Sequence, residues 1–169
     1  MDDANHGEYA RAPEFEDLIP LCKALNEHGV KYMLIGGFAV IIFGFTRGTK
    51  DIDFLVDPSV ENIQKIKKAL SYLPDNAVAE MNDDDIINYH VVRVADEFVI
   101  DLMGKACGVD YKEASKSIEH TIIDGIKIPI ASKELLVRLK DTVRPSDKMD
   151  VSFLKSVIEN QKKLNKLPT

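Results

Sequence analysis

The residues from Leu34 to Asp57 read LIGGFAVIIFGFTRGTKDIDFLVD, and they place two carboxylates one residue apart inside an otherwise apolar run. The β-branched and aromatic residues 30–35 favour a buried strand that ends at a pair of glycines. The apolar residues 38–43 lie between glycines and predict a short buried helix. After the loop FTRGTK, residues 50–56 predict a second strand, which carries both carboxylates.

The spacing of Asp51 and Asp53 places both carboxylates on one face of the second strand, because residues i and i+2 of a strand share a face. Ile52 points to the opposite face, into the core. A third carboxylate, Asp101, interrupts another apolar strand in the sequence FVIDLM. If the two strands are neighbours in the sheet, the three carboxylates converge.

Like-charged carboxylates that lie together resist burial unless a cation offsets their repulsion. Oxygen ligands of this kind suit Mg²⁺ or Mn²⁺. Three carboxylates on two strands can hold two such ions roughly 3.5–4 Å apart, an arrangement used for in-line phosphoryl or nucleotidyl displacement. We therefore expect Asp51, Asp53 and Asp101 to be both the metal ligands and the catalytic residues of such a site.

The glycine pair and the basic loop predict a binding site for phosphate groups. Backbone N–H groups at Gly36 and Gly37 can approach an anion closely because no side chain intervenes. Arg47, Thr49 and Lys50 lie in the loop that enters the acidic strand, and they add further donors. Substrate phosphates, metal ion and carboxylates would then occupy one cleft.

The remainder of the chain predicts a small mixed sheet flanked by helices. Apolar positions at helical spacing favour helices near residues 13–28 and 60–73. β-Branched and aromatic runs favour strands at 89–94 and 97–103, joined by a tight turn at residues 95–96. This alternation of helices and strands predicts an α/β (α+β) fold.

The C-terminal part of the sequence predicts a hairpin followed by two helices. The Asp124-Gly125 pair is a strong hairpin signal. Ser132 is expected to cap a helix that runs to about Val143, and Ser146 is expected to cap the final helix. The predicted organisation is a flexible segment at residues 1–12 and a single domain at 13–169, with the C-terminal helices from about residue 132.

The composition disfavours several classes of function. The chain has 169 residues and a net charge of −6, which argues against non-specific binding along a nucleic-acid backbone, although a local basic patch would still allow an RNA end. Its apolar runs are shorter than the roughly 18–20 residues of a membrane span, and its polar N-terminus lacks a secretory signal. Cys22 and Cys107 lack metal-ligand spacing and are expected to be buried or half-buried thiols. These features predict a cytoplasmic protein with no membrane partner.

The stretch quoted at the start resembles the nucleotidyltransferase superfamily, whose signature is a glycine turn, an Asp-x-Asp pair and a third acidic strand residue. It is most similar to small bacterial proteins related to the AbiEii-type toxin nucleotidyltransferases. Their GG-x-A-x₄-G-x-x-R-x-T-x-D-x-D pattern is met by Gly36, Gly37, Ala39, Gly44, Arg47, Thr49, Asp51 and Asp53. The third acid and the family's late helix pair map onto Asp101, Lys140, Arg144, Asp147 and Asp150. The similarity spans residues 15–154, and Phe43 stands where many relatives have histidine.

This resemblance implies a nucleotidyltransferase-like fold and a metal-dependent enzyme. Such an enzyme moves a nucleoside monophosphate from a nucleoside triphosphate to an acceptor hydroxyl and releases pyrophosphate. The resemblance implies that Asp51 and Asp53 bind the metal and that Asp101 is the third ligand or the base. It also implies that the glycine pair binds phosphate and that Lys140 contacts the triphosphate.

Several alternatives stay open at this point. A nucleotide-binding regulatory or toxin–antitoxin interaction module without turnover fits the same motifs, and so does a relative that binds no ligand. The acceptor could be a tRNA, a protein or a small molecule, and a homodimer or a cognate antitoxin or other partner protein could complete the cleft. From the residues alone, Lys140 could also be a surface lysine, and Arg144 could tie the late helices together through Asp147 or Asp150.

Overall fold

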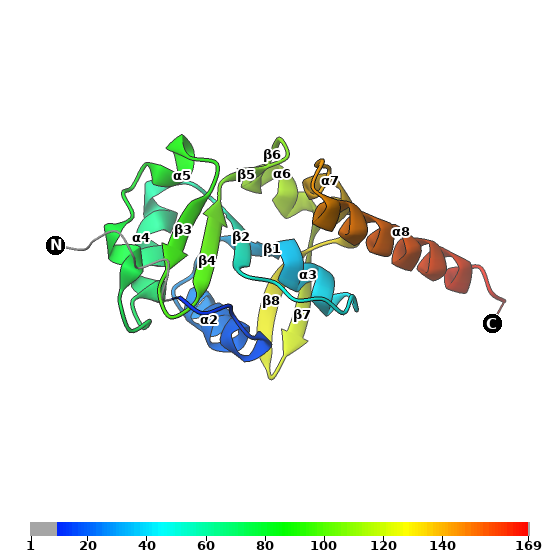
Figure 1. The fold of residues 1–169 in the computed structure, drawn as a ribbon, viewed down its shortest axis with the longest axis horizontal. Coiled ribbons are helices and arrows are strands. Elements are labelled where there is room, and N and C mark those ends of the chain that lie inside the picture. Colours follow the sequence, from blue (N-terminus) through cyan, green and yellow to red (C-terminus); the bar gives the residue numbers. More distant parts are fainter. Residues whose placement is uncertain (1–9, 169) are drawn as a thin grey trace.

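The protein, represented by a computed structural model that describes residues 10–168, contains a six-stranded sheet flanked by helices (Figure 1). The strands of this sheet are β1 (Tyr32–Ile35), β2 (Ile52–Val56), β3 (Val92–Ala95), β4 (Val99–Met103), β7 (Ile118–Ile123) and β8 (Ile126–Ala131). A separate two-stranded ribbon consists of β5 (Lys105–Ala106) and β6 (Val109–Asp110). The α-helices are α2 (Phe15–Glu27), α3 (Gly36–Ile42), α4 (Val60–Leu70), α5 (Asp85–Asn88), α6 (Tyr111–Ala114), α7 (Lys133–Leu139) and α8 (Pro145–Asn165), and short 3₁₀ turns cover Ala77–Glu80 and Ser115–Ser117. The mixed α/β architecture expected from the sequence is confirmed.

The strand order of the large sheet places the two acidic strands side by side. The order is β3-β4-β2-β1-β8-β7, and β2 pairs with β4 in parallel and with β1 in antiparallel orientation. The hairpin of β3 and β4 forms one edge of the sheet, and the hairpin of β7 and β8 forms the other. The convergence of the carboxylates required the two acidic strands to be neighbours in the sheet, and they are.

Alternate residues of the acidic strands fill the core on one face of the sheet. Ile52, Phe54 and Ile100 are each at most 1% exposed. Tyr32 of β1 packs edge-on against Phe54 with ring centroids 5.3 Å apart, and its hydroxyl donates a hydrogen bond to Asn26 of α2. Helix α2 therefore covers this face, and the intervening acidic residues are directed to the opposite face.

The two C-terminal helices begin and end at other residues than the sequence suggested. Helix α7 ends at Leu139 rather than near Val143. Helix α8 begins at Pro145 with Arg144 as its N-cap, so that Ser146 does not cap it. A proline suits the first helical position because the N–H group that it lacks would have had no partner within the helix.

Three further expectations concern the thiols, the N-terminal segment and the membrane. Cys22 is buried as expected, but Cys107 is exposed, in a loop where its thiol lies 3.1 Å from a backbone carbonyl.

The expected flexible segment, residues 1–12, lies mostly outside the described residues. Within the described part, the Arg11 N–H donates to the carbonyl of Glu97, and the guanidinium pairs with Asp17 at 2.6 Å. Among residues 10–168, none of the helices combines the length and the apolar character that crossing a membrane requires.

Candidate metal and nucleotide site

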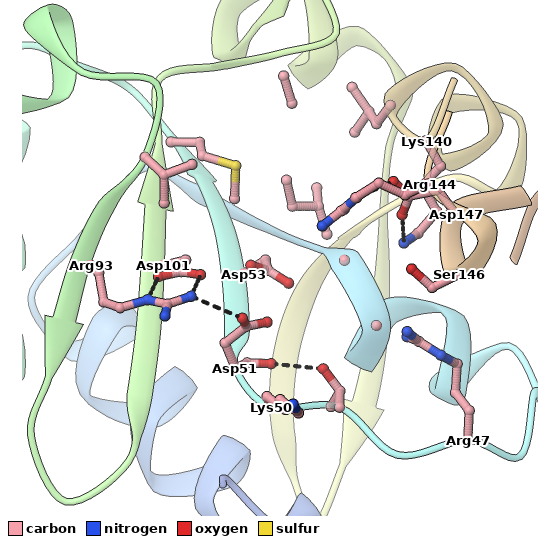
Figure 2. Close-up of a pocket in the computed structure, with 18 of the residues that line it drawn as sticks. Arg47, Lys50, Asp51, Asp53, Arg93, Asp101, Lys140, Arg144, Ser146 and Asp147 are labelled. Carbon is pink, nitrogen blue, oxygen red and sulfur yellow. Dashed lines mark hydrogen bonds and ion pairs between the residues drawn. The ribbon is translucent and has the colours of Figure 1, made fainter. Parts of the chain in front are cut away.

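Asp51, Asp53 and Asp101 converge at one end of the sheet, as Figure 2 shows. The parallel pairing of β2 and β4 places Asp53 directly beside Asp101, and Asp51 immediately precedes β2. One carboxylate oxygen from each residue lies within 4.8 Å of those from the other two. Small side-chain shifts would therefore let one cation contact all three carboxylates. The expected convergence of the three side chains is confirmed.

The electrostatics of this cluster favour a bound cation. Burial raises the pKa of Asp53 well above its usual value, and the negative charges of Asp51 and Asp101 raise it further. Burial also raises the pKa of Asp51, with repulsion from Asp101 as the next cause. At neutral pH the ionised cluster therefore lowers the free energy of unfolding. A divalent cation among the three carboxylates would offset that cost, so the donor set fits Mg²⁺ or Mn²⁺.

Arg93 of β3 is a member of the cluster that the sequence reasoning missed. Its Nε and Nη2 atoms each lie 2.9 Å from an oxygen of Asp101, and Nη2 lies 3.3 Å from Oδ2 of Asp51 (Figure 2). The hydrogen bonds to Asp101 raise the pKa of Arg93. Because the Arg93 side chain is 59% exposed, its guanidinium partly neutralises the carboxylates from the solvent side.

Arg93→Gln is expected to lower the thermal unfolding midpoint of the metal-free protein and to tighten Mn²⁺ binding. Because the ion pair is partly exposed, its loss costs at most about 1 kcal/mol of unfolding free energy. Mn²⁺ would no longer compete with the guanidinium for carboxylate oxygens, and a gain of about 1 kcal/mol corresponds to roughly fivefold tighter binding. Thermal unfolding with and without Mn²⁺ measures both effects.

The matched control for this variant is Arg138→Gln. Arg138 has a side chain that is 58% exposed and pairs with Glu113 at 3.0 Å, but neither residue lines the carboxylate cleft. The control should leave Mn²⁺ binding unchanged. Weaker Mn²⁺ binding by Arg93→Gln would contradict the prediction and would show that Arg93 supports the metal site.

The turn between β1 and α3 brings the backbone against Asp53. Gly36 has a φ of +73°, a conformation that residues with a side chain rarely adopt. A Cβ atom at Gly36 would lie 2.7 Å from Cβ of Asp53 and closer still to its carboxylate. At Gly37, a Cβ atom would overlap with the guanidinium of Arg47 and would lie 2.8 Å from Oγ1 of Thr49. Both glycines are therefore needed for the close packing at this corner.

A group of cationic side chains lies near the same corner, on the loop before β2 and at the junction of α7 and α8. Nζ of Lys140 lies 2.7 Å from Asp150 and 3.5 Å from Asp147. Nε of Arg144 lies 2.8 Å from Asp147, which confirms one of the two pairings considered from the sequence. Asp150 instead pairs with Lys140 and, at 3.4 Å, with Nε of Arg47.

An open cleft of about 960 Å³ joins the carboxylates, the glycine corner and these cations. Its lining includes every residue that the sequence predicted for metal binding, phosphate binding or catalysis: Gly36, Gly37, Arg47, Thr49, Lys50, Asp51, Asp53, Asp101 and Lys140. Arg93, Arg144, Ser146 and Asp147 also line it. A volume of this size is typical of ligand sites, which span about 300–1,000 Å³.

Thr49 and Lys50, two of the predicted phosphate ligands, lie at the end of the basic loop. The hydroxyl of Thr49 donates to the backbone carbonyl of Asp51 at 3.1 Å. This bond fixes the end of the basic loop beside the carboxylate cluster. Lys50 is exposed, so its ammonium group is free to move at the rim of the cleft.

Comparison with known proteins finds similarity in structure but none in sequence. No model of a protein family matches the chain, and no curated protein sequence matches it. A proposed nucleotidyltransferase from Thermotoga maritima is a structural match with a TM-score of 0.51 and 16% identity, and the match covers 90% of this chain and 92% of that one.

Two further solved structures match over similar lengths. The lincosamide antibiotic adenylyltransferase LnuA, in a lincomycin-bound form, gives a TM-score of 0.54 at 20% identity, over 87% of this chain and 99% of that one. An antigenic nucleotidyltransferase-like protein from Paracoccidioides brasiliensis gives a TM-score of 0.51 at 15% identity, over 89% of this chain and 78% of that one. At these identities the likeness concerns the fold, and the chain accordingly has a nucleotidyltransferase-type fold with an acidic triad at its cleft.

Proposed function

We propose that the protein is a metal-dependent nucleotidyltransferase. In the proposed reaction, an acceptor hydroxyl attacks the α-phosphate of a nucleoside triphosphate, the bond to the β-phosphate breaks, and pyrophosphate leaves. The observation that supports this proposal most directly is the convergence of Asp51, Asp53 and Asp101 within 4.8 Å in a cleft that cations also line. The fold shared with the matched structures adds support at the level of architecture only.

The three carboxylates are proposed to hold Mg²⁺ or Mn²⁺. The bound ion would neutralise charge on the triphosphate and lower the pKa of the attacking hydroxyl. Asp51 and Asp53 are assigned as ligands. Asp101 is assigned as the third ligand or as the base that accepts the proton of the acceptor hydroxyl. Asp101 pairs with Arg93 at 2.9 Å, and a bound ion would compete with this guanidinium for its oxygens.

The triphosphate is proposed to lie over the glycine corner. Gly36 and Gly37 line the cleft there, Arg47 lies directly against Gly37, and Lys140 lines the same cleft from the end of α7. Lys50 would add a mobile positive charge at the rim. These groups would bind and orient the phosphates, because guanidinium, ammonium and backbone N–H donors all suit phosphate oxygens.

A second candidate is a nucleotide-binding regulatory or interaction module that does not turn over its ligand. The observation that favours it is Arg93, because a built-in cation lets the fold keep its acidic triad without a metal. The relation to AbiEii-type toxins, a toxin–antitoxin role and a protein partner all remain predictions. The acceptor, whether tRNA, protein or small molecule, is likewise open.

Incubation with each labelled nucleoside triphosphate and a panel of RNA, protein and small-molecule acceptors tests the proposal. We expect Mg²⁺-dependent transfer of label with release of pyrophosphate, and we expect EDTA to abolish both. Binding of Mg²⁺ and nucleotide without pyrophosphate release from any acceptor would favour the second candidate. The absence of any thermal shift with Mg²⁺ and each nucleotide would contradict both candidates.

A further inference from the structure

Asp150 lies behind the cations Arg47 and Lys140, which line the cleft, and its side chain is fully buried, at 0% exposure. Its two carboxylate oxygens face cations from different parts of the chain, with Oδ2 2.7 Å from Nζ of Lys140 and Oδ1 3.4 Å from Nε of Arg47. We propose that Asp150 is a positioning residue, which holds these two cations at the places where they contact the triphosphate. This inference rests on the proposed function, because it concerns the same phosphate site.

Arg47 has a buried donor without an acceptor. Its Nη1 atom is inaccessible to solvent and has no hydrogen-bond partner within residues 10–168. The same atom lies against Gly37, where a Cβ atom would overlap with it. A buried donor is costly to leave unpaired, and because solvent does not reach Nη1, an anion in the cleft would meet the exposed part of this guanidinium, whose side chain is 24% exposed. The 3.4 Å ion pair between Nε of Arg47 and Oδ1 of Asp150 holds the guanidinium in this orientation.

The position of Lys140 depends on the same carboxylate. Lys140 is the C-cap of α7, and its side chain is only 8% exposed. A flexible four-carbon side chain has many rotamers, and the 2.7 Å contact with Asp150, the shorter of its two carboxylate contacts, holds Nζ in one of them. Asp150 therefore fixes one cation from the loop before β2 and one from the end of α7.

The charged side chains around Asp150 carry a net positive charge. The group contains three cations, Arg47, Lys140 and Arg144, and two carboxylates, Asp147 and Asp150. One positive charge is left over within this group, and it faces the triad carboxylates in the same cleft, so it suits an anion once a cation is bound to the triad. Neither oxygen of Asp150 makes a hydrogen bond of good geometry within residues 10–168, so charge attraction is the force that holds the two cations.

The positioning role and simple electrostatics predict opposite changes in triphosphate affinity for a variant at Asp150. Asp150→Asn removes a negative charge close to the phosphate site, and electrostatics alone would then tighten the binding of an anion. If Asp150 positions the two cations, their release into other rotamers weakens binding instead. The direction of the change therefore decides between the two explanations.

The experiment measures the affinity for inorganic triphosphate by calorimetry in metal-free buffer, and the affinity for Mn²⁺ separately. Asp150→Asn is expected to weaken triphosphate binding by about tenfold, which is about 1.4 kcal/mol, and to leave Mn²⁺ affinity within about twofold. Asp96→Asn is the matched control. Asp96 is also a buried carboxylate, but it accepts backbone N–H groups of residues 75 and 77 away from the cleft, so its loss should lower stability without changing triphosphate affinity.

A double-mutant cycle separates positioning from general loss of structure. In an Arg47→Gln/Lys140→Gln background, Asp150→Asn should cause no further loss of triphosphate affinity, because the residues through which it acts are gone. If Asp150→Asn does not fold, the Arg47→Gln and Lys140→Gln variants answer the question. Because both cations share one carboxylate, their losses should be non-additive, and additive losses would overturn the inference.

The outcomes also separate this inference from the proposed function. If the wild-type protein binds triphosphate neither in metal-free buffer nor with saturating Mg²⁺, the proposed phosphate site is wrong and the inference falls with it. If the wild-type protein binds triphosphate and the Asp150→Asn variant binds it equally well or more tightly, only the positioning role is overturned.

Discussion

Asp53→Asn is expected to abolish nucleotidyl transfer while raising the thermal stability of the metal-free protein at neutral pH. The variant removes a central ligand of the proposed metal, and the loss of one such electrostatic group typically reduces turnover by roughly 10²–10³-fold or more. It also removes a carboxylate whose ionisation is unfavourable in the fold, because burial and the charges of Asp51 and Asp101 raise its pKa. Stability and activity should therefore change in opposite directions.

The pH dependence of this stabilisation follows from the sign of the pKa shift. Because the pKa of Asp53 is raised in the fold, the unfolded chain ionises at a lower pH than the folded protein, so the wild type loses unfolding free energy as the pH rises from about 4 through the raised pKa, and the loss is complete above it. The advantage of Asp53→Asn should therefore be largest near pH 8. It should shrink as the pH falls through that raised pKa toward about 4, where an unperturbed aspartate titrates.

Thermal unfolding from pH 4 to 8 and label transfer from nucleoside triphosphates measure the two effects. Each 1 kcal/mol of added stability should raise the unfolding midpoint by about 2–4 °C for a chain of this size. Asp124→Asn is the control, because Asp124 lies in an exposed hairpin turn with φ of +50°, which asparagine also adopts. Full transfer activity in Asp53→Asn would contradict the assignment of the metal site.

Gly36→Ala is expected to eliminate Mn²⁺ binding and to destabilise the protein. Alanine at φ of +73° costs about 1–2 kcal/mol from backbone strain alone. The new Cβ atom would also lie 2.7 Å from both Cβ and Cγ of Asp53. Asp53 cannot relieve this overlap by rotating its carboxylate alone, because its own Cβ is too close. The aspartate must shift, and the carboxylate cluster loses its geometry.

Gly29→Ala separates the two contributions. Gly29 follows α2 with a similar φ of +66°, and a Cβ atom there would meet no other atom within 4 Å. Both variants should lose a similar amount of stability from backbone strain, but only Gly36→Ala should lose Mn²⁺ affinity. Titration with Mn²⁺ and thermal unfolding of both proteins test this prediction. Equal Mn²⁺ binding by both variants would show that the glycine corner does not control the metal site.

The carboxylate cluster could be predicted because strand periodicity is a local property. Within a strand, the i and i+2 spacing predicts a common face for Asp51 and Asp53; β2 in fact begins at Ile52, so Asp51 immediately precedes the strand that was predicted to begin at residue 50. The position of Asp101 required an assumption, because parallel pairing of two strands far apart in the sequence leaves no local signal. The structure supplies that pairing, with Asp53 beside Asp101.

Arg93 was missed because it depends on the register of a hairpin. The sequence suggested a two-residue turn at residues 95–96, whereas Ala95 in fact pairs with Val99 across a three-residue loop. The reason is a long-range contact. The carboxylate of Asp96 is buried and accepts hydrogen bonds from the backbone N–H groups of residues 75 and 77, so it is held away from the hairpin ladder. With the correct register, Arg93 lies opposite Asp101.

At the junction of the last two helices, one feature could be predicted from the sequence and one could not. Pro145 at the first position of α8 could have been predicted, because proline favours that place. The end of α7 at Leu139 could not, since the next residue, Lys140, turns its side chain toward Asp150 of α8. Such a tertiary ion pair overrides the local helix signal of residues 140–143.

The alternation of Asp53 with its apolar neighbours in β2, and of Asp101 with Ile100 in β4, has a consequence for how the chain reaches its native state. A register shift of one residue in either strand would bury a carboxylate in the hydrophobic core and expose an isoleucine to water. A sheet with a shifted register is therefore much less stable than the native one. The acidic residues that are assigned to chemistry thus also specify the strand register during folding. Replacing them with alanines would therefore remove a safeguard against misfolding together with the proposed active site.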